Sequence, residues 1–140
     1  MSGSIFSIVG SALNAQDARI GAIASNLANV DSVTPPGGMP YRAHEVVFEA
    51  APVAQANVSG APALGVNVVG TVETNAAPVQ TYDPDSPFAN AKGYVTGSNV
   101  SQVAQMVDLI DSSDSYSASI AVLQQASRID QQMLSSFQVS

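Results

Sequence analysis

Apolar residues recur at intervals of three, four and seven positions along the first segment of the chain, from Ser4 to Asn29. They are Ile5, Ile8, Val9, Ala12, Leu13, Ile20, Ile23, Ala24 and Leu27. This spacing places them on one face of a helix and no proline interrupts it, so the segment predicts an amphipathic helix. Gly10 and Gly21 each cost about 1 kcal/mol relative to alanine inside a helix, and they indicate close approach by a neighbour.

A second helical pattern runs from Asn99 to Phe137. One heptad seam carries Val103, Met106, Ile110, Ile120 and Leu134, and its flank carries Leu109, Tyr116, Leu123 and Phe137. Ser113, Ser117, Gln124 and Ser127 also occupy the seam. A seam this polar would be a weak homodimer core. The pattern therefore predicts a long helix that packs against other helices through small residues.

The segment between the two helical patterns reads as a small β-rich insert. All eight prolines lie between Pro35 and Pro87. Strands are predicted at 45–49 (EVVFE), at 64–73, where apolar and polar residues alternate, and at 79–82 and 93–96. PPGGMP (35–40) predicts a turn, and 50–63 a mobile loop with little to bury. We therefore expect an α+β chain with an N-terminal helix within 1–30, an insert over 31–97 and a C-terminal helix within 98–140.

Composition narrows the possible functions. The formal net charge is −7, which argues against nucleic acid and against anionic membrane surfaces. The absence of cysteine excludes disulfides, thiolate metal sites and cysteine nucleophiles. Charged residues make up only 11% of the chain, against about 25% in ordinary globular proteins. A surface rich in alanine and serine suits close packing between proteins.

The N-terminus carries an apolar run, SIFSIVGSALNA, without a preceding positive region. Asp17 and Arg19 interrupt it well short of the ~20 residues that a membrane span requires. We expect neither a signal peptide nor a membrane-spanning helix, so export would proceed without a cleaved signal.

Few side chains could carry chemistry. The single histidine, His44, has no nucleophile motif to serve, so a hydrogen-bonded or exposed loop histidine is the favoured interpretation. Asp83 and Asp85 have a calcium-loop spacing, but prolines and Phe88 follow them and favour a proline-fixed turn.

Two further patterns have simpler explanations. Asp108, Asp111 and Asp114 form an acidic row that is expected to be solvated or to face cations of a neighbouring subunit. The sequons at Asn57 and Asn99 are attributed to chance. The sequence thus predicts no catalytic residue, no cofactor site and no metal site.

The segment ASNLANVDS (24–32) covers the end of the first helical pattern and the residues just after it. Asn29 can adopt the left-handed conformation that ends helices, and Asp31 and Ser32 can bond the backbone of the turn. Asn26 and Asn29 are expected to satisfy backbone groups where the chain leaves the helix.

The same segment resembles the signature of bacterial flagellar axial proteins, the rod, hook and hook-associated family. The motif occupies Ala24, Ser25, Asn26, Leu27, Ala28 and Asn29. Most members continue with a threonine and a glycine–aromatic pair, whereas DSVTPPGGMPYRAHEVVFE is similar to the short proximal-rod members of the basal-body rod family. YDPDSPFANAKGYV and SNVSQVAQMVDLIDSSDSYSASIAVLQ resemble their later segments. Ser98 stands where a proline is usual, which leaves the start of the last helix open.

The resemblance implies a structural subunit of the flagellar basal-body rod, exported by the type III apparatus. Its terminal helices would pack with those of neighbours in a coiled-coil-like layer that transmits torque and surrounds the export channel, with the insert outside. The implied interface is Ile5, Ile8, Val9, Leu13, Ile20, Ile23, Leu27, Val103, Met106, Ile110, Tyr116, Ile120, Leu123, Leu134 and Phe137.

The implied partners are copies of this chain, other rod proteins, and basal-body ring and export-gate components, in a rod that spans the periplasm. Two alternatives remain open at this point: another rod or hook member, and a small periplasmic ligand-binding or hydrolytic domain. The single histidine and the missing signal argue against the second alternative.

Overall fold

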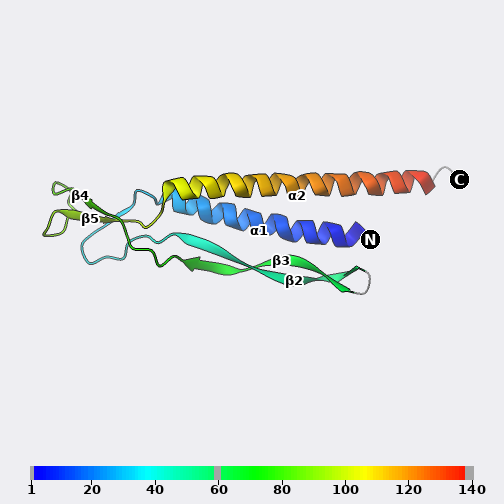
Figure 1. Cartoon of the computed structure of the whole chain (residues 1–140), viewed down its shortest axis with the longest axis horizontal. Helices are drawn as coiled ribbons and strands as arrows, with labels where there is room; N and C mark the ends of the chain where they lie inside the picture. The colour runs from blue at the N-terminus through cyan, green and yellow to red at the C-terminus, as the bar shows by residue number, and fades with distance from the viewer. Residues whose placement is uncertain (1, 59–60, 138–140) are drawn as a thin grey trace. The chain divides into compact units, whose positions relative to one another are not determined.

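The computed structural model describes residues 2–58 and 61–137. Along the sequence, one long helix comes first, five strands follow, and a second long helix comes last (Figure 1). The elements are α1 (Ser2–Ala28), β1 (Val33–Thr34), β2 (His44–Val58), β3 (Ala61–Glu73), β4 (Gln80–Tyr82), β5 (Tyr94–Gly97) and α2 (Gln102–Phe137). The α+β class and the helix–insert–helix order predicted from the sequence are confirmed.

The predicted loop at 50–63 is wrong for the described residues in that range. Residues 50–58 continue β2 and 61–63 begin β3, while 59 and 60 lie outside the described residues. The alanines, prolines and glycine of this segment are typical of loops, but the two strands pair with each other as a two-stranded sheet. The backbone hydrogen bonds between the paired strands outweigh the weak preference of these residues for a loop.

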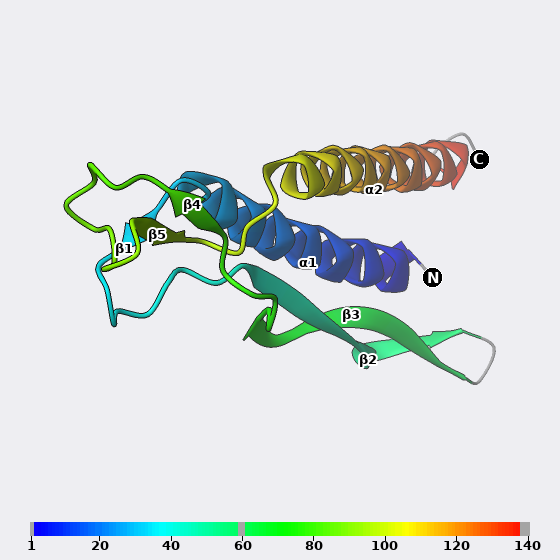
Figure 2. The same cartoon turned by 60° about the vertical axis from the view of Figure 1, so that its left-hand side comes forward.

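A second sheet has the order β1–β5–β4 and is antiparallel throughout. Val33 pairs with Gly97, and Thr81 pairs with Val95. Figure 2 shows its three strands beside the end of α1. The sequence predicted β4 and β5 within one residue at each end, but it missed β1, which has only two residues.

The chain divides into two compact units. The first comprises the described parts of Met1–Ala18, Phe48–Val69 and Asp111–Ser140, and the second comprises Arg19–Val47 and Gly70–Ile110. In the first unit, the N-terminal half of α1 runs between α2 and the β2–β3 pair in both views (Figures 1 and 2).

Ser11 joins α1 to β3 inside the first unit. Its hydroxyl accepts a hydrogen bond from the Val66 N–H at 3.1 Å and donates to the Ile8 carbonyl at 2.7 Å. A Cβ atom at Gly65 would lie 2.6 Å from the Ser11 Oγ and 2.7 Å from a methyl of Val53. The close approach of β3 to α1 therefore requires glycine at position 65. In contrast, a Cβ at Gly10 or Gly21 would meet nothing within 4 Å, so the described residues supply no close neighbour at either position.

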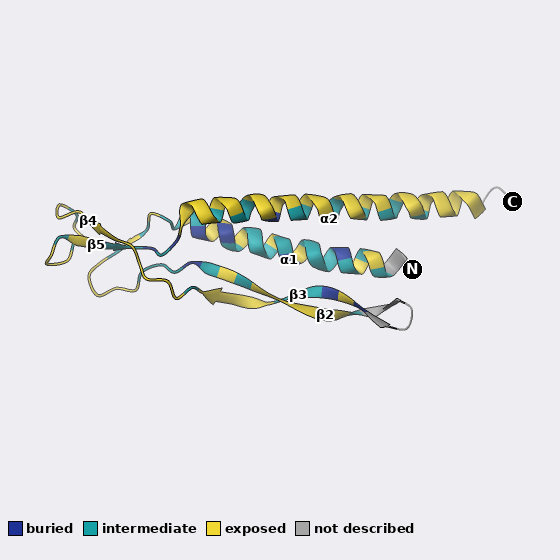
Figure 3. Cartoon of the chain, viewed as in Figure 1, coloured by how far each residue is buried: buried dark blue, intermediate teal, exposed yellow. Residues whose placement is uncertain are grey.

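The buried core is small, and Ile23 is the largest apolar side chain in it among the described residues. Its apolar members are Val9, Ala15, Ile23, Ala43, Ala63, Val95 and Val100, and the largest fully buried side chains are Asn26 and Ser112. Most of α2 is exposed, as the yellow parts of its ribbon in Figure 3 show. Burial of apolar side chains normally dominates the stability of a fold. Because few apolar side chains are buried here, buried polar side chains such as Asn26 contribute an unusually large part of the contacts between elements.

The face of α2 that is covered within the chain differs from the apolar seam seen in the sequence. Partly or fully buried positions recur every three or four residues at Gln105, Leu109, Ser112, Tyr116, Ser119, Leu123, Ala126 and Asp130. The sequence placed Leu109, Tyr116 and Leu123 on the flank of a seam through Val103, Met106 and Ile110, which the structure leaves exposed. The covered seam is mixed in polarity, so hydropathy alone did not reveal it.

Candidate functional site

Asn26, in the last turns of α1, is the centre of the second unit. Its side chain is buried, with only 1% exposed. The amide oxygen accepts from the His44 N–H at 2.8 Å and from the Tyr41 hydroxyl at 3.1 Å. The amide nitrogen donates to the His44 carbonyl at 2.9 Å and to Gln105 Oε1 at 2.8 Å. All four hydrogen-bonding positions of the amide are therefore used, and they tie α1 to β2 and to α2.

The arrangement resembles strand pairing made by a side chain. One amide bonds both the N–H and the C=O of His44, as a backbone neighbour in a sheet would. These two bonds also fix which end of the amide is oxygen, since a backbone N–H only donates and a carbonyl only accepts. Asn26 thus satisfies backbone groups where the helix meets the strands, as the sequence predicted.

The direction of these bonds determines the protonation of the His44 ring. Tyr41 has one hydroxyl proton, and it donates that proton to Asn26 Oδ1. The oxygen of Tyr41 lies 3.0 Å from His44 Nδ1 and must act as the acceptor there. His44 Nδ1 therefore carries a hydrogen. The other ring nitrogen, Nε2, lies 4.0 Å from a carboxylate oxygen of Glu73.

We expect nitrogen NMR of the folded chain to show the neutral His44 ring protonated at Nδ1, the less common tautomer of free histidine. Tyr41→Phe removes the acceptor, so the ring should shift toward protonation at Nε2. Ser25→Ala is the matched control, since the Ser25 hydroxyl bonds the same Tyr41 oxygen at 3.0 Å but does not contact the ring. An Nε2-protonated ring in the unmodified chain would contradict the assigned direction of the network.

Asn99, just before α2, is a second asparagine whose side-chain amide bonds the backbone of other segments. Its amide oxygen accepts from the Ala43 N–H at 2.7 Å. Its amide nitrogen lies 3.2 Å from the Thr74 carbonyl, 3.1 Å from the Thr74 hydroxyl and 3.0 Å from the Ala76 carbonyl. The sequence suggested only a chance sequon here. Its position immediately before a helix was the one signal that could have pointed to this role.

The start of α2 is set by two serines. Ser98, 3% exposed, donates through its hydroxyl to the Val30 carbonyl at 2.7 Å. Ser101 accepts from the Ala104 N–H at 3.4 Å, which makes it the capping residue. The helix therefore begins at Gln102, three residues later than the pattern from Asn99 predicted.

The end of α1 agrees with the interpretation of the ASNLANVDS segment as a helix end. The helix ends at Ala28, Asn29 Nδ2 donates to the Ser25 carbonyl at 2.9 Å, and Ser32 Oγ donates to the Asn29 carbonyl at 2.8 Å. Within the motif, Asn26 is buried and Leu27 half-buried, whereas Ala24, Ser25 and Ala28 are exposed. The left-handed conformation of Asn29 stays a prediction.

The interface residues expected from the sequence fall into two groups. The first is covered at least in part within the chain and comprises Ile8, Val9, Leu13, Ile20, Ile23, Leu27, Tyr116, Ile120 and Leu123. The second is exposed and comprises Ile5, Val103, Met106, Ile110, Leu134 and Phe137. The second group therefore offers a partner more exposed apolar surface than the first.

The remaining candidates have local roles. Asp83 and Asp85 lie in a turn in which the Ser86 N–H bonds the Asp83 carbonyl at 3.3 Å. Asp108 faces Arg19 of the same chain at 3.9 Å, and surface pairs of this kind contribute about 1 kcal/mol or less. Across residues 2–58 and 61–137, no three His, Asp or Glu side chains converge as metal ligands, and no helix has the length and hydropathy to cross a membrane.

Two family descriptions match the parts of the chain that contain Asn26 and Asn99. "Flagella basal body rod protein" matches residues 7–35, which include Asn26 and β1. "Flagellar basal body rod FlgEFG protein C-terminal" matches residues 91–136, which include β5, Ser98, Asn99 and nearly all of α2.

Individual relatives agree with both matches. The flagellar basal-body rod protein FlgC of Escherichia coli O6:H1 is 49% identical over 121 residues, 85% of each chain. FlgC of Salmonella typhimurium is 48% identical over the same share. FlgC of Bacillus subtilis is 36% identical over 124 residues, covering 81% of this chain and 83% of the relative. The chain belongs to the FlgC family of flagellar basal-body rod proteins.

Proposed function

We propose that this chain is a subunit of the flagellar basal-body rod that polymerises through its terminal helices, transmits torque and surrounds the export channel. It is a structural rod protein and not an enzyme. The observation that carries the proposal is the apolar surface of α2, which the chain itself leaves uncovered.

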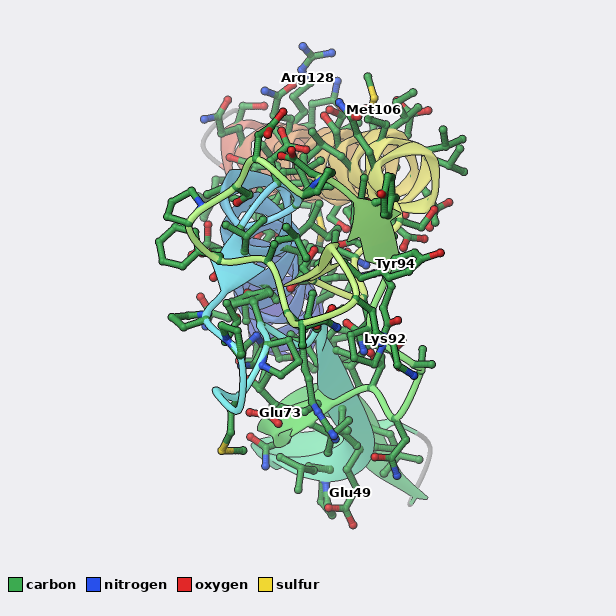
Figure 4. All side chains as sticks on the ribbon, turned by 90° about the vertical axis from the view of Figure 1, so that its left-hand side faces the viewer. Glu49, Glu73, Lys92, Tyr94, Met106 and Arg128 are labelled. Atoms are coloured by element: carbon green, nitrogen blue, oxygen red, sulfur yellow. The ribbon has the colours of Figure 1, made fainter. Side chains whose placement is uncertain are left out.

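That surface is a regular stripe. Val103, Met106, Val107 and Ile110 follow the spacing i, i+3, i+4, i+7, and each is between 52% and 74% exposed. This spacing places all four on one face of the helix. Figure 4 shows the Met106 side chain pointing outward. A stripe of this kind on an isolated subunit favours packing against another helix.

The proposed partners are further copies of the chain, other rod proteins, and the basal-body ring and export-gate components. Terminal helices of successive subunits form the coiled-coil-like layer, and the strands lie outside it. The open space beside Gly10 and Gly21 allows a neighbouring helix to approach α1 closely. Contacts between different surfaces of identical subunits extend into helical assemblies. The rod spans the periplasm.

Imaging of basal bodies that contain this chain, at side-chain resolution, tests the proposal. We expect density for α1 and α2 in the rod, with Val103, Met106, Val107 and Ile110 packed against helices of neighbouring subunits. A rod in which these four side chains face water, or in which the chain is absent, would contradict it.

A further inference from the structure

Two tyrosines lie side by side on one face of the β1–β5–β4 sheet. Tyr82 of β4 pairs with Tyr94 of β5 in the antiparallel register, so both side chains project from the same face. The ring centroids are 5.3 Å apart, the angle between the rings is 66°, and both side chains are exposed. Tyrosine is enriched at interfaces because it buries a large area and loses little conformational freedom. The exposed pair therefore indicates an anchor for a partner.

Lys92 adds a cation next to the tyrosine pair. It precedes Gly93, where a Cβ atom would lie only 2.9 Å from Cε2 of Tyr82, so the backbone of this turn lies against the ring. The side-chain oxygen of Asn90 holds the turn, since it accepts from the Lys92 N–H at 2.8 Å and from the Tyr94 N–H at 3.1 Å. Lys92 is exposed and forms no ion pair among the described residues. We call Tyr82, Lys92 and Tyr94 the tyrosine–lysine surface.

The other cations of the chain do not offer this combination. Arg19 and Arg42 bond to partners within the chain. Arg128 forms no ion pair among the described residues, but its neighbours three and four positions away on α2 are all glutamine. Residues at these spacings surround a side chain on a helix surface, so Arg128 lies in polar surroundings. Lys92 is the cation that lies beside exposed aromatic rings.

Strands β2 and β3 carry a surface of the opposite charge. They contain all three glutamates of the chain and no lysine or arginine. His44 of β2 and Glu73 of β3 share one face, since His44 Nε2 lies 4.0 Å from a carboxylate oxygen of Glu73. Side chains alternate between the two faces along each strand. The opposite face, which we call the acidic strand face, therefore carries Glu45, Val47, Gly70 and Val72.

The acidic strand face is uncovered within the described residues. Glu45, Val47 and Val72 are exposed, and Glu45 forms no ion pair there. A Cβ atom at Gly70 would meet nothing within 4 Å, so the backbone at this position is open. Glycine inside a strand often marks a place where another group approaches closely. An aromatic ring over Gly70 with a cation beside Glu45 is the complementary partner.

We propose that the tyrosine–lysine surface of one copy docks on the acidic strand face of a second copy, with the tyrosine rings over Gly70 and Lys92 beside Glu45. The inference rests on the proposed assembly and names one contact between the strands that lie outside the helical layer. Because the two surfaces are made of different residues of one chain, the contact is heterologous and repeats from subunit to subunit.

Photo-cross-linking of the full-length chain tests the docking. A chain with p-benzoylphenylalanine in place of Tyr94, which keeps an aromatic ring there, is mixed with an isotope-labelled chain at concentrations where the chain self-associates. Irradiation should join position 94 to labelled peptides that contain residues 45–47 or 70–72. The same group in place of Val33 is the matched control, since Val33 is similarly exposed but lies on the other face of the sheet. It should give little of this product.

Charge reversal tests the ionic part. Glu45→Lys in the labelled chain should lower the yield of the mixed product about fivefold, because it places a cation against Lys92. Adding Lys92→Glu in the photoreactive chain should restore the yield. A yield from position 94 no higher than that from position 33 overturns the docking. Cross-links to the same peptides found only within single chains assign the contact to the chain's own strands and also overturn it.

Sedimentation of the same mixtures separates this proposal from the proposed function. Large assemblies without the mixed cross-link leave the rod function standing and refute only this contact. A chain that stays monomeric alone and with other rod proteins refutes both.

Discussion

Asn26→Leu is expected to lower the free energy of unfolding by about 3–5 kcal/mol, although leucine has the same branched arrangement of side-chain heavy atoms as asparagine. The substitution removes the partners of the His44 N–H and C=O, the Tyr41 hydroxyl and Gln105 Oε1 at one position. Each buried polar group left without a partner costs about 1–3 kcal/mol. Urea unfolding followed by circular dichroism measures the change.

Asn29→Leu is the matched control for this result. Asn29 belongs to the same motif, but its amide makes one bond, to the Ser25 carbonyl at the exposed helix end. We expect a loss of about 1 kcal/mol or less. Equal losses of unfolding free energy at positions 26 and 29 would show that the buried hydrogen bonds of Asn26 are not what stabilises the contact between α1, β2 and α2.

The second large effect is expected on assembly. Val107→Asp combined with Ile110→Asp should leave the fold unchanged and abolish incorporation into the rod, and with it swimming. Both side chains are more than 60% exposed, so the isolated chain loses little packing. In the assembly each loses about 1.5–3 kcal/mol of apolar burial and gains a desolvated charge. Association should therefore weaken by more than about a hundredfold.

Ala104→Asp controls for added charge, because Ala104 is exposed on the same turn of α2 but outside the stripe. It should assemble normally. Thermal unfolding of both variants must match that of the unmodified chain for the comparison to hold. Normal motility of the double variant would refute the stripe as an interface. Leu27 and Ile120 are poorer probes, because they are half-buried within the chain and their substitution would also disturb folding.

The candidate site was only partly visible in the sequence. The motif drew attention to Asn26 and Asn29, and the structure separates them into a buried connector and a half-buried helix-end residue. Asn99 was noticed only as a chance sequon, and Gln105 was not singled out. Asn26 lies 18 positions from His44 and 79 from Gln105, and no periodicity along the chain links residues that far apart.

By itself the sequence determined the two helices, most of the strands and the family. These features depend on local spacing, turn chemistry and short motifs, which are written along the chain. Only the tertiary structure decided that 50–58 is a strand, that the covered seam of α2 is the mixed one through Gln105, Ser112 and Ser119, and that the apolar stripe from Val103 to Ile110 faces outward. The physical reason is that strand pairing and burial depend on which segments meet. A short polar side chain is covered wherever it completes a contact, and an apolar one stays exposed where the chain supplies no neighbour.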